Sequence, residues 1–179
     1  MVPMSLRILA PPTSDTSEAP SLVLQCDARK YMFNVGEGTT RVSAQHRASN
    51  MRVDHIFLTR VASETMGGIP GLLMTLADGG RGSIDIHAPP NLLYALAATR
   101  LYARRDTMAL NAHEIEVREP HVCYQDEYVQ IHSVPLVPAQ HRSLYTDIAE
   151  KGPALDVKAQ LSSPKALRGS QAKAWYECI

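Results

Sequence analysis

The chain has 179 residues, an apolar fraction of 45% and balanced charge, with 18 basic and 18 acidic side chains. This length favours one domain, and the apolar fraction is sufficient for a hydrophobic core. Balanced charge excludes the strong global field that marks dedicated nucleic-acid or membrane binders, and no apolar run reaches the roughly 18 residues that a transmembrane helix requires.

Three cysteines, Cys26, Cys123 and Cys178, lie far apart and include no C-x-x-C pair. This spacing argues against a zinc finger, and the odd number favours reduced thiols in an intracellular setting. The first residues lack a basic region followed by an apolar one, so we expect no secretory signal.

The first part of the chain predicts strands joined by turns. Residues 5–10, 21–26 and 30–35 are short runs that favour β-strands, and the last two are expected to pair as a hairpin. Residues 33–41 read F-N-V-G-E-G-T-T-R, and their glycines permit a tight turn at the end of that hairpin. A helix is expected over residues 39–48.

The chain is organised around residues 57–73, which read F-L-T-R-V-A-S-E-T-M-G-G-I-P-G-L-L. Residues 55–59 favour a short buried strand, and residues 69–78 favour a helix in which Pro70 suits the first turn. The loop between them joins a strand to a helix, which is a common position for functional residues in α/β folds.

Both segments resemble signature sequences of the tRNase Z family within the metallo-β-lactamase superfamily. In that family the first segment reads F-D-C-G-E-G-T-Q-R, and the second reads T-H-x-H-x-D-H-x-x-G-L-P-G-L-L. The two segments also occur here in the family's order and at similar spacing. The residues that keep the pattern and are expected to have structural roles are Gly36, Glu37, Gly38, Thr39, Thr59, Gly68, Pro70 and Gly71.

The metal-binding residues of the family pattern are replaced. Its His, His, Asp and His positions hold Arg60, Ala62, Glu64 and Thr65. Zinc requires imidazole, thiolate or carboxylate donors, and the carboxylate of Glu64 alone cannot hold it. We therefore expect neither a metal ion nor catalytic residues in this chain, whereas the resemblance places zinc in the family's catalytic half.

Later elements are predicted from alternation and helical spacing. Residues 83–87 alternate as a strand, and a helix is expected from Pro89 to about residue 103. Residues 114–118 and 128–134 alternate as two further strands. A strand followed by Ala-Pro-Pro and a helix is also similar to the family pattern downstream of the metal loop.

The resemblance covers residues 5–136 and 173–179, and it implies the N-terminal half of a long-form tRNase Z that ends before the family's flexible tRNA-binding arm. We expect a half domain at residues 1–137, a flexible linker or insertion at residues 138–172 and a returning strand at residues 173–179. The implied fold is α/β, a mixed β-sheet with helices packed on it. It would form part of an αββα metallo-β-lactamase-like sandwich.

The resemblance implies that this chain supports the fold and binds tRNA during tRNA 3′-end processing. The C-terminal catalytic half would remove the 3′ trailer as an endonuclease. The expected partners are precursor tRNA, bound weakly by this chain alone, and that catalytic half, with no membrane. Arg41, Arg47 and Arg52 are candidates for RNA phosphate contacts or form a solvated face. The expected compartments are the nucleus, the mitochondrion or the cytoplasm.

Two other hypotheses remain open. In the first, the chain is an active metallohydrolase with unusual ligands drawn from His55, His87 or His132. In the second, it is a pseudoenzyme domain that acts only in protein assembly. The histidines share no H-x-H spacing, which favours structural roles. Metal analysis tests the first hypothesis, and RNA binding tests the second.

Overall fold

The computed structural model describes part of the chain, which folds as two compact units, Met1–Glu114 and Ile115–Ile179. These are called unit 1 and unit 2, and each is described by itself. The half domain predicted at residues 1–137 extends from unit 1 into unit 2. The described residues are 4–10, 20–27, 29–45, 52–99, 107–116, 119–136 and 155–160.

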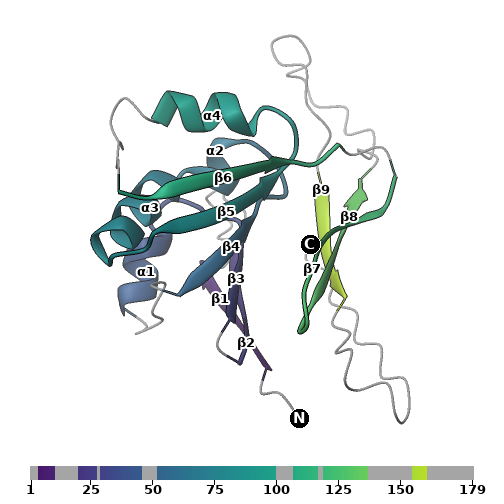
Figure 1. Ribbon diagram of the computed structural model, residues 1–179, viewed down its shortest axis with the longest axis horizontal. Coiled ribbons are helices and arrows are strands. Elements are labelled where there is room, and N and C mark those ends of the chain that lie inside the picture. Colours follow the sequence, from purple (N-terminus) through teal and green to yellow (C-terminus); the bar gives the residue numbers. More distant parts are fainter. Residues whose placement is uncertain are drawn as a thin grey trace. The chain divides into compact units, whose positions relative to one another are not determined.

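Six strands form one mixed β-sheet in the described part of unit 1 (Figure 1). They are β1 (Met4–Ala10), β2 (Ser21–Cys26), β3 (Arg29–Phe33), β4 (Val53–Phe57), β5 (Ser83–Ala88) and β6 (Ala109–Glu114), in that order across the sheet. Strands β1, β2 and β3 are antiparallel neighbours, whereas β3, β4, β5 and β6 run parallel. The predicted hairpin and the predicted mixed sheet are confirmed.

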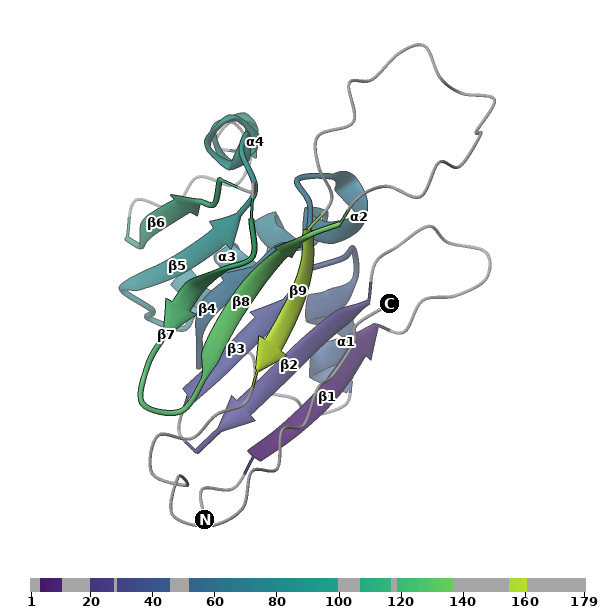
Figure 2. The same ribbon diagram turned by 90° about the vertical axis from the view of Figure 1, so that its right-hand side faces the viewer.

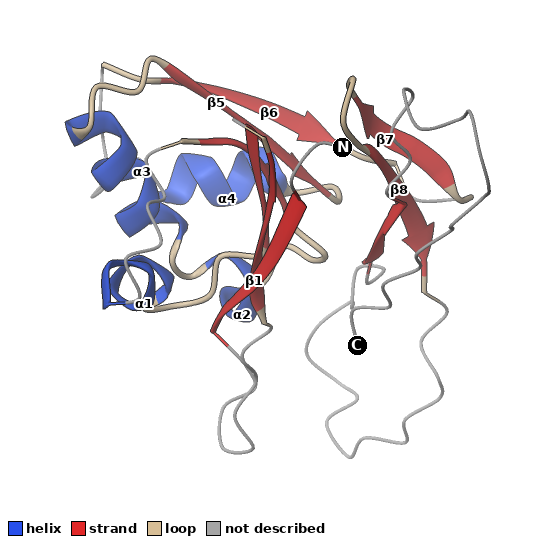
Figure 3. Cartoon of the chain, turned by 90° about the horizontal axis from the view of Figure 1, so that it is seen from below, coloured by secondary structure: helices blue, strands red, loops and turns tan. Residues whose placement is uncertain are grey.

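Four helices connect these strands in the described part of unit 1. They are α1 (Thr39–Gln45), α2 (Ser63–Met66), α3 (Ile69–Asp78) and α4 (Leu92–Thr99). Helices α1, α3 and α4 lie on one face of the sheet (Figure 3). The predicted helix over residues 69–78 is confirmed, and Pro70 occupies its first turn.

The hydrophobic core of unit 1 joins these helices to the sheet. Met32, Ile56 and Ile86 contribute from three neighbouring strands, and Leu72 and Leu76 contribute from α3. All five side chains are fully buried. Burying each one contributes about 1.5–3 kcal/mol to stability. The apolar stripe of α3 therefore fixes which face of that helix packs against the sheet.

Polar and aromatic side chains form rows on the opposite sheet face. The parallel register pairs Phe33 with Phe57, Phe57 with His87, and His87 with His113. Because side chains alternate between the two faces of a strand, these four rings share one face. Phe57 and His87 stack with ring centroids 4.5 Å apart, and His87 and His113 stack at 4.6 Å.

The described part of unit 2 is an antiparallel sheet of β7 (His121–Gln125), β8 (Gln130–Pro135) and β9 (Leu155–Gln160), which Figure 2 shows side by side. The turn between β7 and β8 is closed by Asp126. Its Oδ1 accepts hydrogen bonds from the backbone amides of Tyr128 at 2.8 Å and Val129 at 2.9 Å. A side chain that mimics a backbone turn in this way is typical of Asp.

Three elements differ from the sequence predictions. The strand predicted at residues 114–118 is instead β6, which ends at Glu114 and pairs in parallel with β5. Strand β7 was not predicted, because its exposed and half-buried residues show no clear alternation. Strand β9 lies inside the stretch 138–172, where a flexible linker or insertion was expected, and it pairs along its whole length with β8. The strand predicted at 173–179 lies outside the described residues.

Candidate functional site

Two loops that carry the family-like sequences lie at the same edge of the unit 1 sheet. The glycine-rich turn, residues 34–38, follows β3, and the 58–68 loop, which includes α2, follows β4. Because β3 and β4 are parallel neighbours, both segments leave the sheet at its carboxyl-end edge. This is the edge at which open α/β sheets bind ligands.

Asn34 ties the two loops together. Its backbone has φ of 55°, in the left-handed region that Asn tolerates better than most residues. Its backbone N–H donates to the backbone carbonyl of Phe57 at 2.8 Å. Its Oδ1 accepts hydrogen bonds from both the amide and the hydroxyl of Thr59, each at 3.0 Å. Asn34 thus stands at the Asp position of the family pattern and orients Thr59 through its side-chain oxygen.

The glycine-rich turn is held internally by hydroxyl groups. The Thr39 hydroxyl donates to the Gly36 carbonyl at 2.6 Å, and the Gly36 amide donates to Ser21 Oγ at 3.0 Å. Thr39 and Ser21 are fully buried, so these bonds replace those that the polar groups would otherwise make with water. Gly38 has φ of 76°, which favours glycine, and Glu37 beside it is exposed.

Gly68 is required where the two loops cross. A Cβ atom on Gly68 would lie 2.2 Å from the carbonyl oxygen of Gly36. The close approach is held by two hydrogen bonds, from the Gly68 amide to the Val35 carbonyl at 2.8 Å and from the Val35 amide to the Thr65 carbonyl at 2.7 Å. Gly71 is different, because a Cβ atom there would meet only Thr40 Oγ1, at 3.9 Å.

The four ligand positions of the family pattern lie in the 58–68 loop, and their side chains do not fit zinc. Arg60 is exposed and carries positive charge, and Ala62 has no donor atom. Thr65 is only 2% exposed, and its hydroxyl donates to the Arg60 carbonyl, with the Ala62 carbonyl 3.1 Å away. That hydroxyl therefore closes the loop on itself. Glu64 is left as the one carboxylate of the set, and it accepts from the Ser63 hydroxyl at 3.3 Å.

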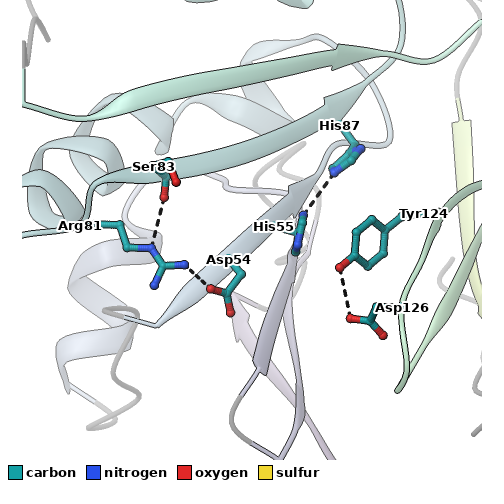
Figure 4. Close-up of polar contacts among 7 residues, drawn as sticks. All are labelled: Asp54, His55, Arg81, Ser83, His87, Tyr124 and Asp126. Carbon is teal, nitrogen blue, oxygen red and sulfur yellow. Dashed lines mark hydrogen bonds and ion pairs between the residues drawn. The ribbon is translucent and has the colours of Figure 1, made fainter.

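Sequence reasoning considered His55 and His87 as ligands but did not group them with His113, and the structure brings the three together on the β4–β5–β6 face of unit 1. His55 Nδ1 lies 3.4 Å from His87 Nε2 (Figure 4), and His113 Nε2 lies 2.8 Å from Asp85 Oδ1. The parallel register creates this cluster from residues about 30 positions apart. Among the described residues, no three His, Cys, Asp or Glu side chains are placed to hold a metal ion. His132, the third ligand weighed from sequence, belongs to unit 2.

His87 is the buried imidazole of this cluster. Burial, followed by repulsion from His113 and His55, lowers the pKa of His87 from 6.5 to about 4, against an opposing effect of Asp85. The folded protein thus keeps His87 neutral under conditions in which the unfolded chain binds a proton there. The stability that depends on a neutral His87 is fully present above pH 6.5, and it is lost as the pH falls toward 4.

We predict that His87→Phe reduces acid destabilisation between pH 6.5 and pH 4. Phenylalanine keeps the ring stacked on Phe57 but takes no proton. A pKa shift of one unit corresponds to about 1.4 kcal/mol, so the parent should lose about 2–3 kcal/mol more than the variant over this range. Urea unfolding at half-unit pH steps measures the difference. Parallel pH profiles for parent and variant would contradict the assignment.

The arginines predicted to contact RNA are only partly described. Arg41 is exposed on α1, with its guanidinium over Gly38, and Arg52 is exposed in the turn before β4. Burial, followed by repulsion from Arg7 and Arg52, lowers the pKa of Lys30, so Arg52 lies within electrostatic reach of other cations. Arg47 lies outside the described residues. Among those residues, no helix has the length and apolar character needed to cross a membrane.

Comparisons with known proteins identify the family to which these loops belong. The profile of the tRNase Z endonuclease family matches residues 7–68, which include the glycine-rich turn and the 58–68 loop. The mitochondrial tRNase Z TRZ4 of Arabidopsis thaliana is 39% identical over 146 residues, which cover 72% of this chain and 15% of that protein.

Solved structures agree with this family and with the predicted α/β fold. A long-form RNase Z from yeast superposes with a TM-score of 0.65 and 27% identity, over 75% of this chain and 18% of that chain. The metallo-β-lactamase fold protein YhfI of Bacillus subtilis has a TM-score of 0.59 at 8% identity, over 89% of this chain and 58% of that chain, and supports the fold alone. This chain spans less than a fifth of the tRNase Z relatives named here. By sequence and by fold, the chain belongs to the tRNase Z family.

Proposed function

We propose that this chain is a metal-free half domain of a long-form tRNase Z. It supports the fold and contributes to tRNA binding, while zinc-dependent removal of the 3′ trailer takes place in the C-terminal catalytic half. The observation that carries the proposal is Thr65, whose hydroxyl is bonded to the loop backbone at a position where the family pattern has a metal ligand. A loop closed in this way keeps the family architecture but offers no metal site.

The partners follow from this assignment. Precursor tRNA is the substrate class of the family, and the catalytic half of the same protein is the second partner. Arg41 and Arg52 support tRNA contact, because both are exposed and positively charged. The Arabidopsis relative is described as mitochondrial, so the mitochondrion is the compartment that we propose. An assembly-only pseudoenzyme would share the fold but would not bind RNA.

The double substitution Arg41→Gln/Arg52→Gln tests RNA binding. Each lost phosphate contact should reduce the magnitude of the slope of log affinity against log salt by about 0.7–0.9, so the double variant should reduce it by about 1.4–1.8. Fluorescence anisotropy with a labelled precursor tRNA over a salt series measures this slope. Circular dichroism spectra check that the fold is retained.

The matched control is Arg41→Lys/Arg52→Lys, which keeps both charges and is expected to keep the parent slope. An unchanged slope in the glutamine variant would show that these arginines do not contact phosphate. Failure of the parent chain to bind precursor tRNA at low salt would favour the assembly-only hypothesis.

A further inference from the structure

A polar cavity of about 420 Å³ lies in unit 1. It is at the amino ends of the parallel strands, because Arg29, Asp54 and Ser83 are the first or second residues of β3, β4 and β5. Four residues of extended strand, about 13 Å, separate Asp54 from Leu58, where the 58–68 loop begins. The cavity is therefore separate from the degenerate metal loop. Its lining residues are Arg29, Asp54, His55, Arg81, Ser83 and Asp85.

One side of the cavity is built by Arg81 and Asp54. The two side chains form an ion pair, and Arg81 Nε also donates to the Ser83 carbonyl at 3.2 Å (Figure 4). Asp54 sits at an irregularity in the β3–β4 register, where β4 has one extra residue. Such bulges redirect side chains. A guanidinium has five N–H donors, and the contacts of Arg81 with Ser83 and Asp54 use two of them, so donors remain for a ligand.

The other side presents the carboxylate of Asp85. His113 Nε2 lies 2.8 Å from Asp85 Oδ1 and fixes its position. Burial alone would raise the pKa of Asp85, but hydrogen bonds from His113 and Asn111 and the nearby His55 together lower it. Asp85 is therefore ionised near neutral pH. An ionised carboxylate accepts about four hydrogen bonds, which exceeds those made here.

The balance of charges indicates which ligand fits. Two guanidiniums and two carboxylates line the cavity, so it has no net excess of positive charge that would select a simple anion. A neutral group with donors beside acceptors satisfies both kinds of side chain. Guanine and cytosine edges are of this kind, because Arg pairs with guanine O6 and N7 and carboxylates accept from base amino groups. Single-stranded RNA is read by proteins through such exposed base edges.

We propose that this cavity binds one unpaired guanine or cytosine base of RNA. The inference rests on the proposed function, because it assumes that RNA is the partner. The carboxylates of Asp54 and Asp85 accept from the base amino group, and Arg29 and Arg81 donate to its carbonyl and ring nitrogen. The volume lies within the range of 300–1,000 Å³ typical of small-molecule sites, so it suits one base with its ribose.

Mononucleotides test the proposal directly. Isothermal titration calorimetry with GMP, CMP, UMP and inorganic phosphate should give affinities for GMP or CMP roughly tenfold above that for UMP. Arg29→Gln should weaken GMP and CMP binding, and because Arg29 is exposed at the start of its strand, this variant should fold. Arg60→Gln removes the same charge at the opposite sheet edge and should leave nucleotide binding unchanged.

Three other outcomes would overturn the base-binding proposal. Inorganic phosphate that binds as tightly as GMP would show an anion site, and equal affinity for all three nucleotides would exclude base recognition. Absence of mononucleotide binding in a chain that still binds precursor tRNA would reject the cavity as a base site. That last result would leave the proposed function intact, because the salt-slope experiment depends on Arg41 and Arg52.

Discussion

Gly68→Ala is expected to lower the free energy of unfolding by at least about 3 kcal/mol. The new Cβ atom would lie 2.2 Å from the carbonyl oxygen of Gly36 and 3.1 Å from its carbonyl carbon, and neither backbone atom can move away as a flexible side chain would. Relief requires the glycine-rich turn and the 58–68 loop to separate. Separation would break the bonds that Val35 makes with Gly68 and with Thr65.

Gly71→Ala is the matched control for this prediction. Gly71 lies three residues away, is exposed in α3, and has only Thr40 Oγ1 near its would-be Cβ, at an ordinary contact distance of 3.9 Å. Alanine is favoured over glycine in helices by up to about 1 kcal/mol, so this variant should be as stable as the parent or more stable. Urea unfolding of both variants gives the comparison. Equal destabilisation of the two would show that crowding at Gly68 is not the cause.

Local sequence patterns predicted the elements that depend on near neighbours. The helix at residues 69–78 followed from its apolar spacing and Pro70, and the β2–β3 hairpin followed from two short β-rich runs. The turn after β3 followed from Gly36 and Gly38. These signals lie within a few residues of each other, and the physical causes, side-chain periodicity and backbone freedom, act over the same short range.

The histidine cluster could not be predicted in this way. His55, His87 and His113 share no local spacing, and only the parallel pairing of β4, β5 and β6 brings them to one face. Strand β9 is a different case, because its own sequence, L-D-V-K-A-Q, alternates apolar and polar residues and pairs with β8. The signal was local but lay in a stretch whose proline and small polar residues favoured a flexible linker. Alternation of strand residues, combined with the correct parallel register, is the signal that would have grouped the histidines.

The role of Thr65 was also hidden in the sequence. From sequence alone, a threonine at a histidine position indicates only that a metal ligand is lost. The structure shows that the Thr65 hydroxyl instead contacts the carbonyls of Arg60 and Ala62. The loop therefore has its own means of closure. Asn34 has a similar part, because its side chain binds Thr59 where the family pattern has an Asp. Residues that differ from the family pattern, such as Thr65 and Asn34, thus make hydrogen bonds that hold the loops of this chain.

Restoring the family's ligand residues is therefore expected to destabilise the protein without restoring activity. The quadruple variant Arg60→His/Ala62→His/Glu64→Asp/Thr65→His removes the Thr65 hydroxyl. The Arg60 carbonyl then loses this donor at a cost of about 1–3 kcal/mol, whereas the Ala62 carbonyl keeps the backbone amides of Thr65 and Met66. Imidazole is also larger than the threonine side chain, and overpacking a 2% exposed site costs typically about 1–3 kcal/mol more.

The triple variant that keeps Thr65 is the control. Arg60 is exposed and Ala62 and Glu64 are half-buried, so we expect these substitutions to change stability by less than about 1 kcal/mol. Comparison of the two variants in urea isolates the contribution of Thr65.

The same proteins, with and without zinc, are then assayed for cleavage of precursor tRNA. We expect at most weak zinc binding and no 3′-trailer removal, because the 58–68 loop supplies only part of a two-metal site. A quadruple variant as stable as the triple variant would show that Thr65 does not close the loop. Specific trailer removal above a zinc-only control would show that this chain retains a complete catalytic framework.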